Sequence, residues 1–123
     1  CRVGLVSSAG LVEPGQKPFD DTIRGGDYGF RVLRSTTEPG SLVESHRSES
    51  FDRSGLEEDP SLVFPLPRLR EMASEGRIGE VAPRHLSFMG SITAPGRLVR
   101  DSLPEAAEVF AEDGVDVALL VPV

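Results

Sequence analysis

The chain has 123 residues and carries 20 acidic against 13 basic side chains, a formal net charge of −7. This balance lacks the basic stripe that phosphate-backbone binding requires, so no nucleic acid is expected as a partner. A hydrophobic content of 38% at this length suits one modest core, and we expect residues 1–123 to form a single domain. No apolar run approaches the roughly 20 residues that span a bilayer. The single cysteine permits no internal disulfide. We therefore expect a cytoplasmic protein that does not enter a membrane.

The first structural signal is the apolar, β-branched run at residues 3–8, which an Ala-Gly pair closes. It predicts a buried strand that leaves the sheet through a turn. Residues 13–27 contain two prolines and three glycines without an apolar period, which predicts a long irregular loop. Residues 28–33 alternate well enough to predict a second strand at a sheet edge, and residues 41–46 are a further strand candidate.

The middle of the chain alternates between clear and ambiguous patterns. Residues 47–60 are polar and acidic and are typical of a loop. Residues 65–75 carry apolar side chains at helical spacing, with proline in the first turn and Gly76 beyond the end, which predicts a helix of about three turns. Residues 78–92 fit a short strand or a tight loop, and the pattern does not separate the two.

The last two elements suggest the architecture. Residues 95–112 predict an amphipathic helix that Pro104 kinks or divides, and Gly114 caps it. Residues 115–121 are almost continuously apolar, as in a central parallel strand covered on both faces. Helix, glycine and buried strand form the second half of a βαβ crossover. We therefore expect an α/β fold with three layers and a mainly parallel sheet with flanking helices, of the Rossmann or flavodoxin-like type.

A central strand normally leads into another helix that covers the sheet. We therefore expect the chain to be an N-terminal fragment that ends at a central strand. A downstream fragment, a partner chain or a subunit interface would then complete it and cover the apolar patch.

The residues alone offer few catalytic candidates. Cys1 could act as a nucleophile with its own α-amine as base, although a small thiol that begins a strand is the commoner situation. His46 and His85 are candidates for acid and base or for metal ligands. No compact His/Cys/Asp motif accompanies them, so no metal site is expected. Glycines such as Gly25 do not form a phosphate-cradling motif, which argues against a nucleotide site.

Several segments of the chain, taken together, nevertheless carry a family resemblance. They are the opening residues 2–11, Pro18-Phe19-Asp20, Ser45-His46, residues 59–70 and residues 82–90. Together they resemble the selenoprotein B family of the glycine, sarcosine, betaine and D-proline reductases. The most specific pieces are Val63-Phe64-Pro65-Leu66 and the block Arg84-His85-Leu86-Ser87-Phe88-Met89-Gly90. The resemblance runs from end to end of the chain.

The resemblance implies that a selenocysteine or cysteine directly after the last strand reductively cleaves a carbon–nitrogen bond of an amine or amino-acid substrate. A selenolate or thiolate suits this step because it is ionised at neutral pH when its pKa is lowered, and it attacks soft carbon well. The residues up to Val123 contain no nucleophile of this type, and Cys1 does not match it. The D-proline reductase relatives imply a further route, in which a proprotein is cut at a cysteine and the new amino-terminal residue becomes a carbonyl cofactor. A self-processed downstream fragment would then carry the Cys/Sec or the Cys-derived carbonyl group, and no other cofactor is expected.

The resemblance also implies roles for individual residues. Arg84 would pair with a substrate carboxylate through its planar fork, and His85 would pass a proton to the leaving amine, with His46 as the third choice. Ser87 and Ser8 are the expected substrate-binding residues. The alternative is a structural role, in which Arg84 and His85 lie in a polar turn.

The expected partners are a small amine or amino-acid substrate, a companion fragment or subunit, further copies of the chain in a homo-oligomer, and a thiol electron donor. Two other functions stay open because a fold does not fix its chemistry. The same fold could serve as a lyase or hydrolase in a specialised pathway, or the chain could be a non-catalytic partner subunit.

Overall fold

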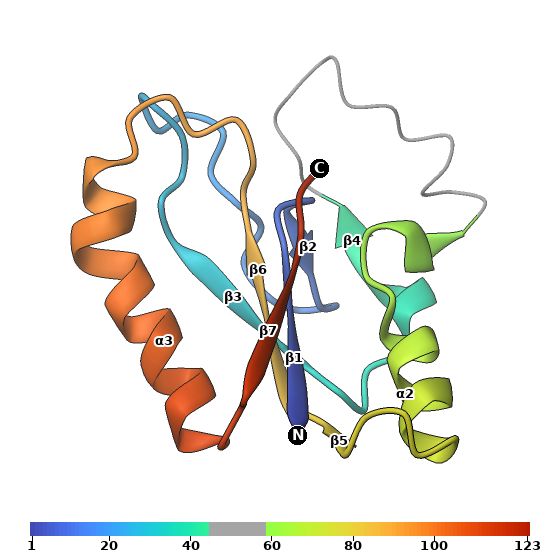
Figure 1. The fold of residues 1–123 in the computed structure, drawn as a ribbon. Coiled ribbons are helices and arrows are strands. Elements are labelled where there is room, and N and C mark those ends of the chain that lie inside the picture. Colours follow the sequence, from blue (N-terminus) through green and yellow to red (C-terminus); the bar gives the residue numbers. More distant parts are fainter. Residues whose placement is uncertain (45–58) are drawn as a thin grey trace.

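A computed structural model describes residues 1–44 and 59–123 of the chain, shown in Figure 1. Its centre is a mixed sheet of parallel strands with one antiparallel strand at an edge. The parallel strands are β1 (Arg2–Ser7), β5 (Glu80–Val81), β6 (Arg84–Phe88) and β7 (Val117–Val121), and the antiparallel strand is β3 (Phe30–Arg34). A separate short ribbon pairs β2 (Leu11–Val12) with β4 (Val43–Glu44).

Strand β1 lies at the centre of the parallel part. On one side it pairs with β7 from Val3 opposite Val117 to Ser7 opposite Val121. On the other side it meets β5 at its beginning and β6 at its end. Two extra residues, Ala82 and Pro83, stand between β5 and β6 and bulge the strand without removing it from β1. The ambiguous stretch at residues 78–92 therefore contains a buried strand.

The two α-helices of the described residues cover opposite faces of the sheet (Figure 1). Helix α2 (Leu66–Ser74) buries Leu66 and Leu69 in one core cluster with Leu5 of β1. Helix α3 (Leu103–Glu112) buries Ala106 in another cluster. That cluster also holds Leu86 of β6, whose side chain points to the other face. The helices and the sheet thus form three layers, and the expectation of an α/β fold with flanking helices is confirmed at this level.

Pro104 divides the last helical segment. Leu98–Ser102 form a π-helical turn in which the amide of Leu103 donates to the carbonyl of Leu98, and the regular α3 follows. Proline has no N–H to offer the preceding turn, so the backbone ahead of Pro104 adopts a wider hydrogen-bond pattern. The predicted division of this helix is confirmed. The loop predicted at residues 13–27 also contains no helix or strand.

Strand β7 differs from the expected central strand. Within the described residues it has β1 as its one neighbour and so forms a sheet edge. Its side chains are exposed on both faces, with Val117 49% and Leu120 67% accessible. The pattern of the sequence is that of a covered strand, but among the described residues only the last residue of β7, Val121, packs against a core cluster. In residues 1–44 and 59–123 no helix has the length and apolar character needed to cross a bilayer.

Candidate functional site at the carboxyl edge of the sheet

The connections of the sheet diverge between β1 and β7. After β1 the chain forms the edge strand β3, then passes through α2 on one face and returns to the sheet at β5 and β6 on one side of β1. It then passes through α3 on the other face and returns at β7 on the other side. In open α/β sheets, ligands bind beyond the carboxyl ends of the strands at such a switch point. We therefore define the carboxyl-edge site as Ser7, Ser8, Ser87 and Val123, which lie within two residues of the carboxyl ends of β1, β6 and β7.

Ser8 ties the ends of β1 and β7 together. Its amide donates to the carbonyl of Val121 at 3.2 Å, and its Oγ accepts from the amide of Val123 at 2.8 Å. The side chain of Ser8 therefore fixes the backbone that follows β7, directly at the switch point. Any residue that follows Val123 in a longer polypeptide would begin beside this hydroxyl.

Ser7 and Ser87 stand opposite each other on β1 and β6, and both are fully buried. The Oγ of Ser7 accepts a long hydrogen bond of 3.3 Å from the amide of Ala9. The Oγ of Ser87 has no hydrogen-bond partner among the described residues. A buried hydroxyl left without a partner costs about 1–3 kcal/mol, and such groups in native proteins often serve a function. Ser87 Oγ is thus a buried polar atom without a described partner near the carboxyl end of β6.

Arg84 lies at the opposite end of β6. Its guanidinium donates to the two carboxylate oxygens of Asp113 at 2.7 and 2.9 Å, and to Glu112 at 3.1 Å. This hydrogen bonding holds the pKa of the Asp113 carboxyl below its usual value. Arg84 and Ser87 are three positions apart along the strand, which corresponds to about 10 Å. The structure therefore does not bring Arg84 to the serines of the carboxyl-edge site, and its fork is already occupied.

His85 is buried in the core with both ring nitrogens in use. The amide of Leu5 donates to Nδ1 at 2.9 Å, so the proton of the neutral ring lies on Nε2, which is 2.9 Å from Oγ of Ser35. That hydroxyl donates onward to the carbonyl of Ala82 at 2.5 Å. The ring also meets Phe64 edge to face, with centroids 5.5 Å apart. Burial lowers the pKa of His85 to about 4, and the charge of Arg70 acts in the same direction. His85 is therefore neutral at pH 7.

The remaining candidates lie apart from the carboxyl-edge site or outside the described residues. His46 is in the stretch 45–58 and is not described. Cys1 is exposed ahead of β1, at the amino end of the parallel strands. No three His, Cys, Asp or Glu side chains of the described ranges gather as metal ligands.

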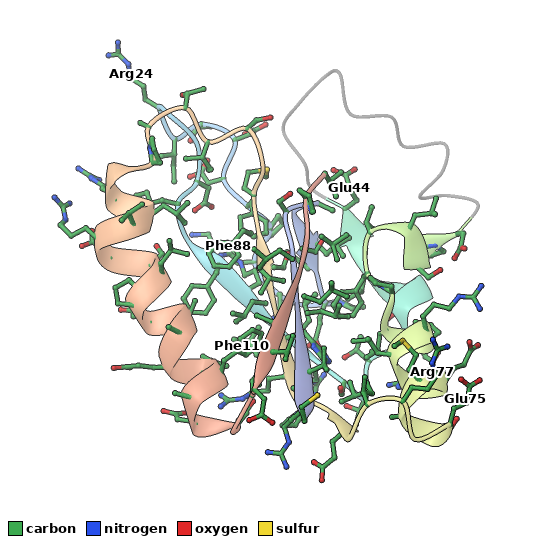
Figure 2. The ribbon with its side chains drawn as sticks, in the orientation of Figure 1. Arg24, Glu44, Glu75, Arg77, Phe88 and Phe110 are labelled. Carbon is green, nitrogen blue, oxygen red and sulfur yellow. The ribbon has the colours of Figure 1, made fainter. Side chains whose placement is uncertain are left out.

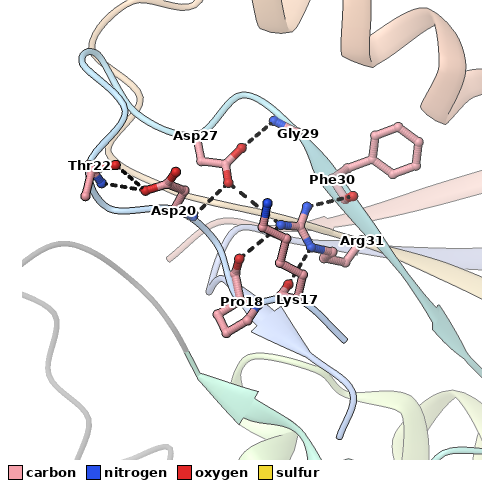
Figure 3. Close-up of polar contacts among 8 residues, drawn as sticks. All are labelled: Lys17, Pro18, Asp20, Thr22, Asp27, Gly29, Phe30 and Arg31. Carbon is pink, nitrogen blue, oxygen red and sulfur yellow. Dashed lines mark hydrogen bonds and ion pairs between the residues drawn. The ribbon is translucent and has the colours of Figure 1, made fainter. Parts of the chain in front are cut away.

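A second polar network orders the long loop after β2, and Figure 3 shows it in close-up. The buried carboxylate of Asp27 accepts from the amides of Asp20 and Gly29 at 2.8 and 2.9 Å. The guanidinium of Arg31 donates to the carbonyls of Lys17 and Pro18 at 2.8 and 3.2 Å. Sequence reasoning missed this network. The only local signal was an acidic residue two positions before a glycine, a pattern that fits an Asx turn.

Comparisons with known proteins identify relatives along nearly the whole chain. The family model described as glycine/sarcosine/betaine reductase selenoprotein B matches residues 1–122. The D-proline reductase subunit gamma of Acetoanaerobium sticklandii is 31% identical over 96% of this chain and 47% of its own length. In Peptoclostridium acidaminophilum, a sarcosine reductase complex component B subunit beta is 29% identical and a glycine reductase complex component B subunit gamma is 30% identical. Each of these two matches covers 97% of this chain and 27% of the relative.

The chain thus spans about half or about a quarter of the length of the curated relatives it matches. No solved structure shows a significant match to it. The resemblance read from the sequence motifs is confirmed, because the family model matches nearly every residue. The chain belongs to the glycine/sarcosine/betaine reductase selenoprotein B family.

Proposed function

We propose that this chain is a subunit, or part of a subunit, of a reductase complex that cleaves a carbon–nitrogen bond of a small amine or amino acid. The observation that carries the proposal is the hydrogen bond from the Val123 amide to Ser8 Oγ at the switch point of the sheet. A cysteine or selenocysteine directly after β7 would begin beside Ser8, where ligand sites of this fold class lie. The names of the relatives, all subunits of amino-acid reductases, support the same reaction class.

The proposed step needs a nucleophile, a proton and two electrons. The thiolate or selenolate attacks the substrate carbon, a carbon–sulfur or carbon–selenium bond forms, and the carbon–nitrogen bond breaks. The amine leaves with a proton. A dithiol electron donor then supplies two electrons and a proton: the carbon–sulfur or carbon–selenium bond breaks, the reduced product and the free thiolate or selenolate form, and the donor becomes a disulfide. Ser87 and Ser8 would bind the substrate through their hydroxyls. We propose a cytoplasmic location for this complex, because thiols stay reduced there.

A direct test uses the full-length polypeptide that contains these residues, together with its companion subunits and a dithiol donor. Glycine, sarcosine, betaine and D-proline are offered, and amine release is measured. We expect Ser8→Ala to lower turnover by roughly 10²-fold, because it frees the backbone that positions the nucleophile. Ser74→Ala is the matched control, since Ser74 is exposed on α2 and bonds within its own helix. Amine release that needs no electron donor would favour a lyase or hydrolase, and no turnover of any substrate would favour a non-catalytic subunit.

The same assay decides the roles predicted for Arg84, His85 and His46. If they act on substrate, their replacement by alanine lowers turnover while the fold, followed by circular dichroism, is retained. If Arg84 and His85 only hold the sheet, the variants lose stability and keep the turnover of the folded fraction. Wild-type turnover in all three variants would remove them from the mechanism.

Intact mass under denaturing conditions tests the proposed self-processing. One species with the mass of the whole reading frame would exclude a chain break. Two species, one of them ending at Val123, would support the break, and an anomalous mass at the start of the second would identify a cysteine-derived carbonyl group.

Strand β7 is the surface through which we propose that a companion polypeptide completes the sheet. Its free edge and exposed Leu119 and Leu120 offer backbone hydrogen bonds and apolar contacts together. Leu120→Arg should therefore weaken assembly with the companion, measured by light scattering after size exclusion. Leu62→Arg is the matched control, because Leu62 is 61% exposed and Leu120 is 67% exposed. Equal assembly of both variants would argue against this surface, and a shift in the self-association of the chain alone would assign it to a homo-oligomer.

A further inference from the structure

A separate cavity lies between the loop after β2 and the segment that begins the last helix. Its volume is about 660 Å³, within the range of small-molecule sites. Arg24 and Tyr28 line it from the loop, and Arg97 and Arg100 line it from the helical segment. We call this cavity the arginine pocket. Its charge is opposite to that of the chain as a whole, which carries −7.

The arginines of the pocket are only partly neutralised. Arg24 makes no ion pair or side-chain hydrogen bond within residues 1–44 and 59–123, and Figure 2 shows it projecting away from the body of the molecule at the rim. Arg97 lies over the ring of Tyr28, 5.5 Å from its centroid, which orients the guanidinium without satisfying its donors. Arg100 pairs with Asp101 at 3.1 Å. Three arginines and one aspartate leave a local charge of about +2.

The two walls of the pocket are fastened to each other. The carbonyl of Gly25 accepts from the amides of Thr93 and Ala94 at 3.0 and 3.2 Å. Gly25 has a φ of 84°, and a Cβ at this position would lie 2.5 Å from the Cβ of Ala94. The loop can approach this closely only because the residue is glycine. Farther along, the Asp27 network holds the same loop. The pocket is therefore formed before any ligand arrives.

The start of the helical segment contributes further donors. The amide of Val99 donates to the carbonyl of Pro95, and no side chain caps this end. The first amides of a helix lack partners within the helix and favour negative charge. Gly96 and Arg97 at this end of the segment line the pocket, and the planar forks of guanidinium groups match the oxygens of carboxylates and phosphates.

We infer that the arginine pocket binds a small organic dianion, either a phosphate monoester or a dicarboxylate, through Arg97 and the start of the helical segment, with Arg24 adding positive charge at the rim. The local charge matches two negative charges, and Ile23 and Tyr28 offer contacts to the organic part of the ligand. This inference does not rest on the proposed reductase activity, because the pocket is built from other residues than the carboxyl-edge site.

The test measures binding to the full-length polypeptide by calorimetry at constant ionic strength. The probes are phenyl phosphate and succinate, with chloride as the reference anion. We expect at least one probe to bind, and Arg97→Ala to weaken that binding by about tenfold or more, since it removes a charge-assisted fork. Arg24→Ala should weaken it less, because its side chain stands at the rim. Binding of phenyl phosphate alone would identify a phosphate ligand, and binding of succinate alone a dicarboxylate.

Arg77→Ala is the matched control, with the same change in net charge. Arg77 is exposed, pairs with Glu75, and lies at the opposite end of the molecule from Arg24 (Figure 2). The inference is overturned if neither probe binds more tightly than chloride, or if Arg77→Ala weakens binding as much as Arg97→Ala. Arg97→Lys keeps the charge and removes the fork. If Arg97→Ala does not fold, Arg97→Lys and Arg24→Ala are tested as separate variants. Probe binding as tight as that of the wild type in both variants would also overturn the inference.

Discussion

The amide of Leu5 on β1 donates a hydrogen bond to Nδ1 of His85 on β6, so that an imidazole replaces a backbone carbonyl as the partner of a central strand. The extra residues between β5 and β6 open the gap that the ring fills. Ser35 completes the arrangement on the other ring nitrogen. His85 therefore acts as a hydrogen-bonded cross-link inside the sheet. Only the neutral ring can make this link, because Nδ1 must be unprotonated to accept from the amide of Leu5.

This cross-link predicts a pH dependence of stability. The pKa of His85 lies near 4 in the folded protein and near its ordinary value of 6.5 in the unfolded chain. The unfolded chain binds more protons between these values, so stability falls as the pH falls through this window. From pH 7 to pH 5 the contribution of this residue is about 2 kcal/mol. Urea unfolding at pH 7 and at pH 5 should show this loss of about 2 kcal/mol in the free energy of unfolding of the wild type. Between the same two pH values, His85→Asn should lose about 2 kcal/mol less than the wild type. Equal losses in both proteins would contradict the assignment.

Ser87 and Ser35 give opposite predictions for the same substitution. Ser87 Oγ is buried without a described partner, so Ser87→Ala should leave the free energy of unfolding within about 0.5 kcal/mol or raise it. Ser35→Ala leaves Nε2 of His85 without its partner and should cost about 1–3 kcal/mol. Chemical denaturation measures both. A large loss in Ser87→Ala would show that this hydroxyl has a structural partner after all.

Gly4 is required by the ring that packs on it. A Cβ at this position would lie 2.7 Å from the ring of Phe110, so the helix can approach β1 only over a glycine. Gly4→Ala should destabilise the fold by about 1–3 kcal/mol through overpacking. Gly40→Ala, where a Cβ would meet nothing within 4 Å, is the control. Combining Gly4→Ala with Phe110→Leu should recover part of the loss, and strict additivity would rule out this contact as the cause.

Gly25 and Gly15 separate backbone strain from close contact. Both have positive φ, 84° and 87°, but a Cβ at Gly15 would meet nothing within 4 Å. Gly15→Ala should cost about 1 kcal/mol from the left-handed backbone alone. Gly25→Ala carries that cost and also pushes the loop away from Ala94, so its loss of thermal stability should be clearly larger. Similar melting temperatures for the two variants would mean that the walls of the arginine pocket separate without penalty.

Local sequence patterns determined most of the elements. The apolar spacing at residues 65–75 corresponds to α2, Leu66–Ser74, and Gly76 follows with a φ of 74°. The alternation at residues 28–33 corresponds to β3 at a sheet edge, Phe30–Arg34. These predictions hold because helical and strand periods place apolar side chains on one face within a single segment. The family, too, followed from short motifs in the chain.

The sites depended on tertiary structure. Arg84 and Ser87 are three positions apart in one motif, yet the first is drawn to Asp113 at the end of α3 and the second faces Ser7 at the carboxyl edge. Ser8 meets Val123, 115 residues away. The arginine pocket likewise joins a loop and the start of a helical segment that are distant in sequence. Sequence periodicity sets which face a residue occupies, but strand order and loop packing set which distant groups meet it. Strand order and loop packing depend on contacts between segments, and no local pattern encodes those contacts.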